Sequence, residues 1–208
     1  MSNQTIAAEE LAAVEVHGIS RGAFLLRATL AAGAVYGAVA VTPFVKQALA
    51  QEQMGDVDIV NYALTLELLE AAFYKEGQKL KLSGDLEKYA KTFGDEEQQH
   101  VEALTATTKK LGGKPPATPT FSFPVKDEKS FLKLAMTLED TGVSAYNGAA
   151  PMIKSKEVLG AAGSIVQIEA RHAAAIRLLA DEDPAPEAFD KALPMAAVLK
   201  AVQPLIKS

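Results

Sequence analysis

The sequence contains no cysteine, so disulfides, thiolate zinc sites, iron–sulfur clusters and a cysteine nucleophile are all excluded. Aromatic residues make up only 6% of the 208 residues, while alanine, leucine, glutamate and lysine fill long stretches, as is typical of an all-helical protein. The net charge of −5 provides no basic surface of the kind that nucleic-acid binders carry, so we expect no nucleic-acid partner. Any bound metal ion must therefore be held by oxygen and imidazole ligands.

Residues 1–50 differ from the rest of the chain and are typical of an export signal. An uncharged apolar run spans residues 28–45 and is followed by an A-x-A triplet at residues 48–50. This pattern predicts cleavage after Ala50. Retention as an uncleaved anchor is the alternative, because about 18 apolar residues is the lower limit for spanning a bilayer.

Residues 20–25 (SRGAFL) resemble a twin-arginine export signal. Gly22 stands where that motif has its second arginine, which leaves the export route open. We expect a periplasmic or secreted protein that contacts the membrane only through its signal segment.

The remaining sequence predicts an all-α bundle. Gly112 and Gly113 form a helix-ending signal, and Asp127 is a suitable N-cap. Residues 112–126 hold four prolines and two glycines, which indicates a long extended connection. Short, long and short loops are typical of two antiparallel helical hairpins joined by one crossover. The four helices are expected at about residues 58–80, 86–111, 127–151 and 155–180, within a bundle domain spanning 55–182.

The tail, residues 183–208, is interrupted by prolines and contains no recognisable motif. One short helix is predicted near residues 195–202, and we expect the tail to pack against the bundle.

One pattern of four residue types occurs twice in the bundle, and the two copies are separated by a constant offset along the chain. The first copy is Glu67, Tyr74, Glu97 and His100, and the second is Glu139, Tyr146, Glu169 and His172. The offset indicates that the first helical hairpin is repeated as the second. Two hairpins related in this way can pack around a pseudo-two-fold axis, which brings equivalent side chains together at the centre.

The repeated pattern has the spacing of a dinuclear metal site. A glutamate and a histidine three residues apart lie on one face of a helix, so both reach the bundle axis. One glutamate from each of two helices plus Glu-x-x-His from the other two is the ligand set of di-iron and di-manganese bundles. Four carboxylates in an apolar core would repel one another, and two divalent cations would neutralise them. The predicted metal ligands are Glu67, Glu97, His100, Glu139, Glu169 and His172.

Other side chains near this pattern have weaker assignments. Tyr74 and Tyr146 lie two helical turns after the first glutamate of each copy and are expected to hydrogen-bond ligand carboxylates, with electron transfer or core packing as alternatives. Glu70 could compete as a ligand, but the repeat places Gly142 at the equivalent position, so we expect Glu70 beside the ligands or on the surface. Glu96 and Glu102 are expected in solvent.

Residues 61–67 (NYALTLE), 71–74 (AAFY) and 138–146 (LEDTGVSAY), with the doubled motif, resemble the ferritin-like superfamily. More specifically, they resemble an exported bacterial ferritin-like domain family that also includes plant desiccation-related proteins. The resemblance covers about residues 55–180. It implies a four-helix bundle whose dimetal centre is bridged by carboxylates and held by the six predicted ligands.

Two functions fit these features. In the first, two ions, iron more readily than manganese, react with a small oxidant, dioxygen or peroxide, in ferroxidase or peroxide-detoxifying chemistry. In the second, the dimetal site is structural, and the protein acts without catalysis in desiccation or envelope stress. Rubrerythrin-like electron relay is disfavoured because cysteines are absent, a manganese catalase stays open, and so does assembly as a homodimer.

Overall fold

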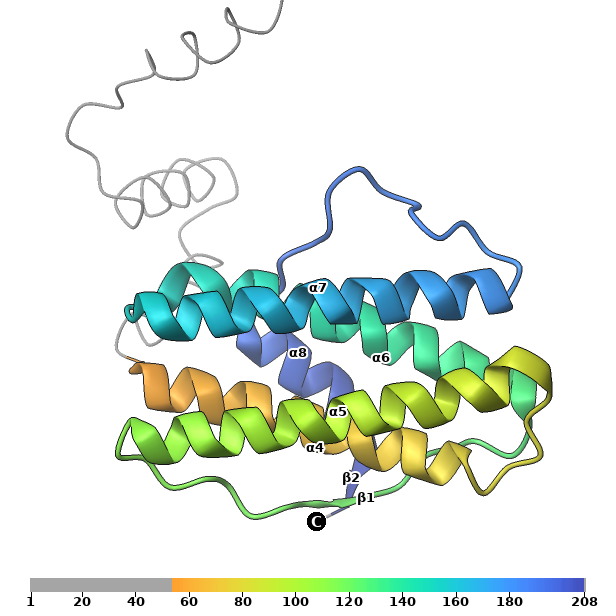
Figure 1. The fold of residues 1–208 in the computed structure, drawn as a ribbon, viewed down its shortest axis with the longest axis horizontal. Helices are drawn as coiled ribbons and strands as arrows, with labels where there is room; N and C mark the ends of the chain where they lie inside the picture. Colours follow the sequence, from red (N-terminus) through yellow and green to blue (C-terminus); the bar gives the residue numbers. More distant parts are fainter. Residues whose placement is uncertain (1–53, 208) are drawn as a thin grey trace, which may run out of the picture. The chain divides into compact units, whose positions relative to one another are not determined.

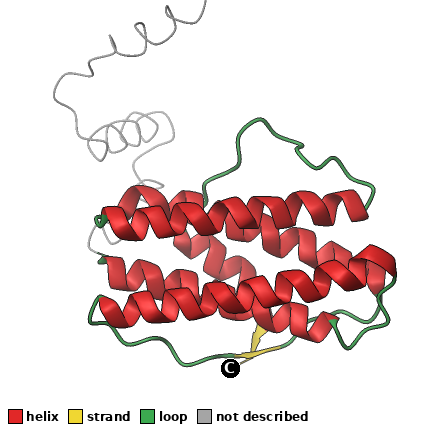
Figure 2. Ribbon diagram, viewed as in Figure 1, coloured by secondary structure: helices red, strands yellow, loops and turns green. Residues whose placement is uncertain are grey.

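A computed structural model describes residues 54–207, and the predicted export signal lies outside this range. The described chain forms four long helices and a short fifth one (Figures 1 and 2). The predicted all-α four-helix bundle is therefore confirmed. No helix between residues 54 and 207 is both long enough and apolar enough to cross a membrane. The helices are α4 (Asp56–Gly77), α5 (Gly84–Lys110), α6 (Glu128–Ala149), α7 (Lys156–Leu179) and α8 (Met195–Val202).

The four long helices pack as two hairpins. α4 packs along α5 and α6 along α7, while the contacts of α4 with α6 and of α5 with α7 join the hairpins. The connection from α5 to α6 runs along the length of the bundle, as Figure 1 shows, so every neighbouring pair of helices is antiparallel. This is the predicted arrangement of two hairpins and one crossover.

A small two-stranded ladder ties the C-terminal tail to the crossover, and the sequence did not predict it. β1 (Thr120–Phe121) pairs antiparallel with β2 (Ile206–Lys207), with Phe121 opposite Ile206. In the same tail, α8 packs against α6 and buries Val198 completely. Two short 3-10 turns complete the structure, η1 (Ala150–Met152) and η2 (Gln203–Leu205).

The ends of the helices lie at capping residues that the local sequence provides. The Asp127 carboxylate accepts a hydrogen bond of 2.8 Å from the backbone N–H of Ser130, so Asp127 is the N-cap of α6, worth about 1 kcal/mol. At the end of α5, Gly112 adopts a φ of 78° and the N–H of Gly113 donates to the carbonyl of Thr108 at 2.9 Å. This is a Schellman motif, which needs a left-handed residue at the position of Gly112.

The turns of the two hairpins are held by reciprocal contacts across the bundle. At the start of α4, the Asp56 carboxylate accepts hydrogen bonds of 2.8 Å from the backbone N–H groups of Lys154 and Ser155. At the start of α6, the Glu128 carboxylate accepts a hydrogen bond of 2.9 Å from the backbone N–H of Ser83. Asp56 and Glu128, like Ser83 and Ser155, are separated by the same offset as the two copies of the ligand pattern. The repeat therefore extends from the ligand positions to the ends of the helices.

Two glycine substitutions should change stability in opposite directions. A methyl group added at Gly112 would meet no atom within 4 Å, so Gly112→Ala adds only the strain of a left-handed alanine. We expect the free energy of unfolding to fall by about 1 kcal/mol. Gly160 lies in α7 and is equally open, so Gly160→Ala should raise the free energy of unfolding by about 0.5–1 kcal/mol. Urea denaturation measures both, and equal effects would contradict the assigned backbone conformations.

Candidate metal centre

The six predicted ligands come from the four long helices and meet in the middle of the bundle. Glu67 projects from α4, Glu139 from α6, and the two Glu-x-x-His pairs from α5 and α7. All four glutamates are 0% exposed, and His172 is 2% exposed. The side chain of His100 is 12% exposed, so this histidine lies nearest to solvent. The structure therefore brings together all six side chains that the repeat singled out.

The ligand atoms divide into two groups, in each of which the atoms lie within 4.8 Å of one another. We call these groups the His100 position and the His172 position. Glu97 and Glu169 belong to both groups, whereas each histidine and each of the other two glutamates belongs to one. The carboxylates of Glu97 and Glu169 therefore each lie close to the donor atoms of both groups. The His100 position consists of Glu67, Glu97, His100 and Glu169, and the His172 position consists of Glu97, Glu139, Glu169 and His172.

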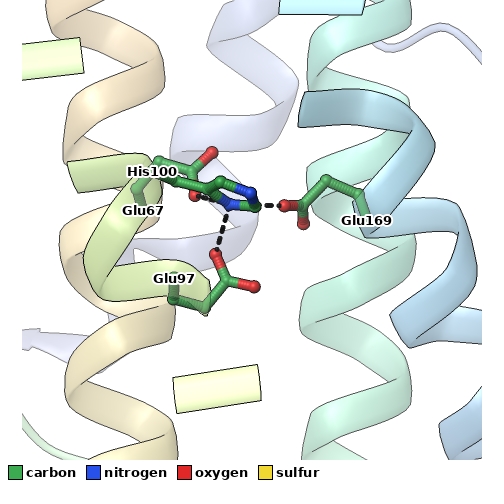
Figure 3. A group of neighbouring side chains, drawn as sticks. All are labelled: Glu67, Glu97, His100 and Glu169. Carbon is green, nitrogen blue, oxygen red and sulfur yellow. Dashed lines mark hydrogen bonds and ion pairs between the residues drawn. The ribbon is translucent and has the colours of Figure 1, made fainter. Parts of the chain in front are cut away.

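Three carboxylates converge on the ring of His100 (Figure 3). Its Nδ1 lies 3.1 Å from Oε2 of Glu67, 3.1 Å from Oε2 of Glu97 and 3.3 Å from Oε1 of Glu169. These oxygens come from α4, α5 and α7, so one imidazole nitrogen links three helices.

The ring of His172 has a carboxylate close to each of its nitrogens. Nδ1 faces the cluster, 2.9 Å from Oε1 of Glu97 and 3.5 Å from Oε2 of Glu139. Nε2 lies 2.7 Å from Oε2 of Glu96, whose side chain is 41% exposed. The expectation that Glu96 is simply solvated is therefore wrong, whereas Glu102 is exposed as expected. The repeat could not identify Glu96, because its equivalent is Ile168.

The two tyrosines make reciprocal contacts between the hairpins. The hydroxyl of Tyr146, on α6, donates to Oε1 of Glu67 on α4 at 2.5 Å. The hydroxyl of Tyr74, on α4, donates to Oε1 of Glu139 on α6. Each tyrosine therefore orients the glutamate of the opposite hairpin. A ligand carboxylate was the predicted partner of each tyrosine, but the sequence did not reveal that this partner lies across the bundle.

Glu70 adds a fifth carboxylate to the core. It is only 3% exposed, so its expected alternative place on the surface is wrong. A side chain on Gly142 would come within 3.2 Å of Oε1 of Glu70 and within 2.8 Å of Oε2 of Glu169. The glycine therefore leaves the space that both carboxylates occupy. The break in the repeat at these two positions thus has a steric reason.

Several buried ligand atoms have no hydrogen-bond partner among residues 54–207. They are Oε1 of Glu97, Oε2 of Glu139, both carboxylate oxygens of Glu169 and Nδ1 of His172. Buried polar atoms are normally satisfied, and an unsatisfied group needs an explanation such as an ion. These atoms face one another, and they are the hard oxygen and imidazole donors that iron and manganese accept. The donor set therefore fits a pair of metal ions.

The carboxyl groups have shifted pKa values. Burial raises the pKa of Glu67 from 4.5 to about 8. Burial opposes ionisation of Glu97 as well, but the imidazoles of His100 and His172 reverse the shift and lower its pKa to about 2. Burial also raises the pKa values of the remaining carboxyls, those of Glu70, Glu139 and Glu169.

The pKa values of the two imidazoles are raised, which keeps the rings positively charged beside the carboxylates. Burial alone would lower the pKa values of both histidines, but the surrounding carboxylates raise that of His100 to about 12 and that of His172 to about 11. Without metal, protons on the imidazoles and carboxyls therefore balance the cluster. Metal ions must displace these protons in order to bind.

An all-helical bundle of this kind is a ferritin-like fold, and its buried cluster of glutamate and histidine from four helices suggests a dimetal site. The chain belongs to the ferritin-like domain family, whose model matches residues 55–182. No curated protein matches the chain.

Two solved structures share the fold. One is described as ferritin-like, diiron-carboxylate proteins from Bacillus anthracis str. Ames; it is 20% identical, with a TM-score of 0.53, and the match covers 60% of this chain and 94% of that one. The other is a conserved hypothetical protein from Mycobacterium tuberculosis, 16% identical with a TM-score of 0.58, covering 66% of this chain and 99% of that one. At these identities the similarity shows the fold alone.

The metal-free protein should lose stability as the pH rises. A group whose pKa is higher in the folded than in the unfolded state binds more protons when folded, so stability falls between the two values. For Glu67 this range is 4.5 to about 8, and for His100 and His172 it begins at 6.5 and ends near 12 and 11. We expect the melting temperature of the metal-free chain to fall from pH 6 to pH 9.

Two comparisons test the origin of this pH dependence. The metal-loaded chain should show a smaller fall, because the ions replace the protons. Glu67→Gln, which cannot ionise, should reduce the fall in the metal-free chain. A melting temperature of the metal-free chain that stays constant or rises between pH 6 and pH 9 would contradict the shifted pKa values.

Proposed function

We propose that this protein is an exported oxidoreductase in which two iron ions, or alternatively two manganese ions, react with dioxygen or peroxide. The reaction that we propose is either ferroxidase activity or peroxide detoxification, in defence against stress. The observation that supports this most strongly is that Glu97 and Glu169 belong to both groups of ligand atoms. Carboxylates shared in this way hold two ions close enough to act on one oxidant.

The side chains of the centre have separate tasks in this proposal. Glu97 and Glu169 would bridge the ions, and the two imidazoles would complete the ligand sets as neutral donors. Tyr74 and Tyr146 hold the terminal glutamates in place across the hairpins. When bound, a pair of redox-active ions would supply the electrons that reduce the oxidant, and the negative charge of the buried carboxylates would stabilise the oxidised ions.

An apolar cavity supports dioxygen as an oxidant. It has a volume of about 20 Å³ and lies between all four long helices, and its wall includes Leu66, Leu104, Ala145 and Ala162. Tyr146 also lines this cavity and donates its hydroxyl to Glu67, so it belongs to both the cavity and the metal centre. A cavity of this size holds one molecule as small as water, and an apolar wall favours an apolar one. The apolar wall favours dioxygen over peroxide, which is polar.

The choice of metal and the setting of the protein are parts of the proposal. Iron is favoured because the similar structure from Bacillus anthracis is described as diiron-carboxylate, whereas the same donors would also accept manganese. Export to the periplasm or the medium follows from the signal predicted in residues 1–50. Kinship with exported and desiccation-related ferritin-like proteins, suggested by residues 138–146, fits a role in stress.

Substitution of a shared ligand tests the proposal. Glu97→Ala removes a donor from both positions, so the purified chain should lose both ions, with affinities at least about 100-fold weaker, and its aerobic oxidation of Fe(II) should disappear. Glu102→Ala is the matched control, because Glu102 lies on the same helix and is exposed. Elemental analysis gives the number of ions per chain, and oxygen or peroxide consumption gives the turnover.

The outcomes separate the candidate functions. Two ions per chain with turnover support the oxidoreductase. Two ions that stabilise the chain without any turnover would instead support a structural dimetal site in a non-enzymatic stress protein. A Glu97→Ala chain that keeps both ions would contradict the assignment of the centre.

A further inference from the structure

The two candidate metal positions differ in the groups that hold their histidines. Glu96 contacts Nε2 of His172 at 2.7 Å, on the side of the ring away from the cluster. Phe93 stacks on the same ring, with centroids 3.9 Å apart and planes inclined by 26°. Nε2 of His100 has no hydrogen-bond partner among residues 54–207, and the His100 side chain is more exposed. His172 is therefore the better fixed of the two imidazoles.

The same difference is visible in the sequence, because the residues that contact His172 are not repeated. The offset that relates Glu97 to Glu169 also relates Phe93 and Glu96 to Ile165 and Ile168. Both residues that hold His172 are thus replaced by aliphatic side chains at the positions equivalent by the repeat. The six ligands obey the repeat, whereas the residues that support the histidines do not.

A carboxylate on the outer nitrogen of a metal-binding imidazole has a known effect. It fixes the tautomer, orients the ring toward the ion and makes the imidazole a stronger donor. At His172 the nitrogen left for an ion is Nδ1, which faces Glu97 and Glu139. The loss of such a partner typically weakens metal binding about 10–100-fold. Glu96 would thus act as a positioning residue for one metal position only.

We propose that the two positions are unequal: the His172 position binds the first ion and binds it more tightly, because Glu96 and Phe93 hold its histidine. This inference rests on the proposed dinuclear centre. The shared carboxylates increase the inequality, because an ion at the His172 position already neutralises part of the charge of Glu97 and Glu169. The His100 position, which is nearer to solvent, then takes the second and more readily exchanged ion.

Titration of the metal-free full-length chain with Mn(II) tests this order, since electron paramagnetic resonance distinguishes free from bound Mn(II). The unmodified chain should bind two ions in two separate phases. Glu96→Ala should weaken the tighter phase about 10–100-fold and leave the weaker phase nearly unchanged. Glu102→Ala removes the same charge from the exposed face of the same helix and should change neither phase.

A gain of function provides the reciprocal test and does not depend on a damaged variant. Ile168→Glu supplies the His100 position with the carboxylate that the repeat lacks there, so the weaker phase should tighten and the two phases should approach each other. Either of two results would overturn the inequality. One is a titration with two equal phases that Glu96→Ala does not alter, and the other is an Ile168→Glu chain whose weaker phase does not tighten. If the unmodified chain binds neither Mn(II) nor, under anaerobic conditions, Fe(II), the dinuclear centre itself is refuted.

Discussion

The burial of carboxylates is the constraint on which the rest of this structure depends. Five glutamates, one from each of three helices and two from α4, have at most 3% of their surface exposed. Taking charged groups out of water costs several kcal/mol each unless opposite charges or protons compensate them. The protonated imidazoles of His100 and His172 provide part of this compensation. Protons on buried carboxyls such as that of Glu67, whose pKa is raised, provide another part. A pair of metal ions would replace these protons as the opposite charge in the cluster.

An internal repeat supplies the geometry that this compensation requires. The hairpins are related by one constant offset along the chain, and contacts made by one hairpin on the other are returned at equivalent positions. Such reciprocity holds the helices in register at the metal centre and at the turns. The repeat fails where Glu70 uses the space left by Gly142, and where Glu96 holds His172. The reciprocal pairs are Tyr74–Glu139 with Tyr146–Glu67, and Asp56–Ser155 with Glu128–Ser83.

The sequence predicted the features that depend on periodicity and local chemistry. Helix spacing, the Gly112–Gly113 signal and the doubled motif were enough for the bundle and for the group of six side chains. Contacts between distant segments that lie outside the repeat could not be predicted, because neither a local pattern nor the repeat marks them. The pairing of Phe121 with Ile206 and the contact of Glu96 with His172 are of this kind. Both depend on how whole helices and loops pack.

Two ions held between Glu97 and Glu169 are the central claim for this protein. The most direct measurement is an anomalous-scattering map from crystals of the iron-loaded protein, recorded at the iron absorption edge. We expect two peaks roughly 3.5–4 Å apart, each contacted by both of these carboxylates and by one histidine. A single peak, or peaks outside the six side chains, would contradict the claim.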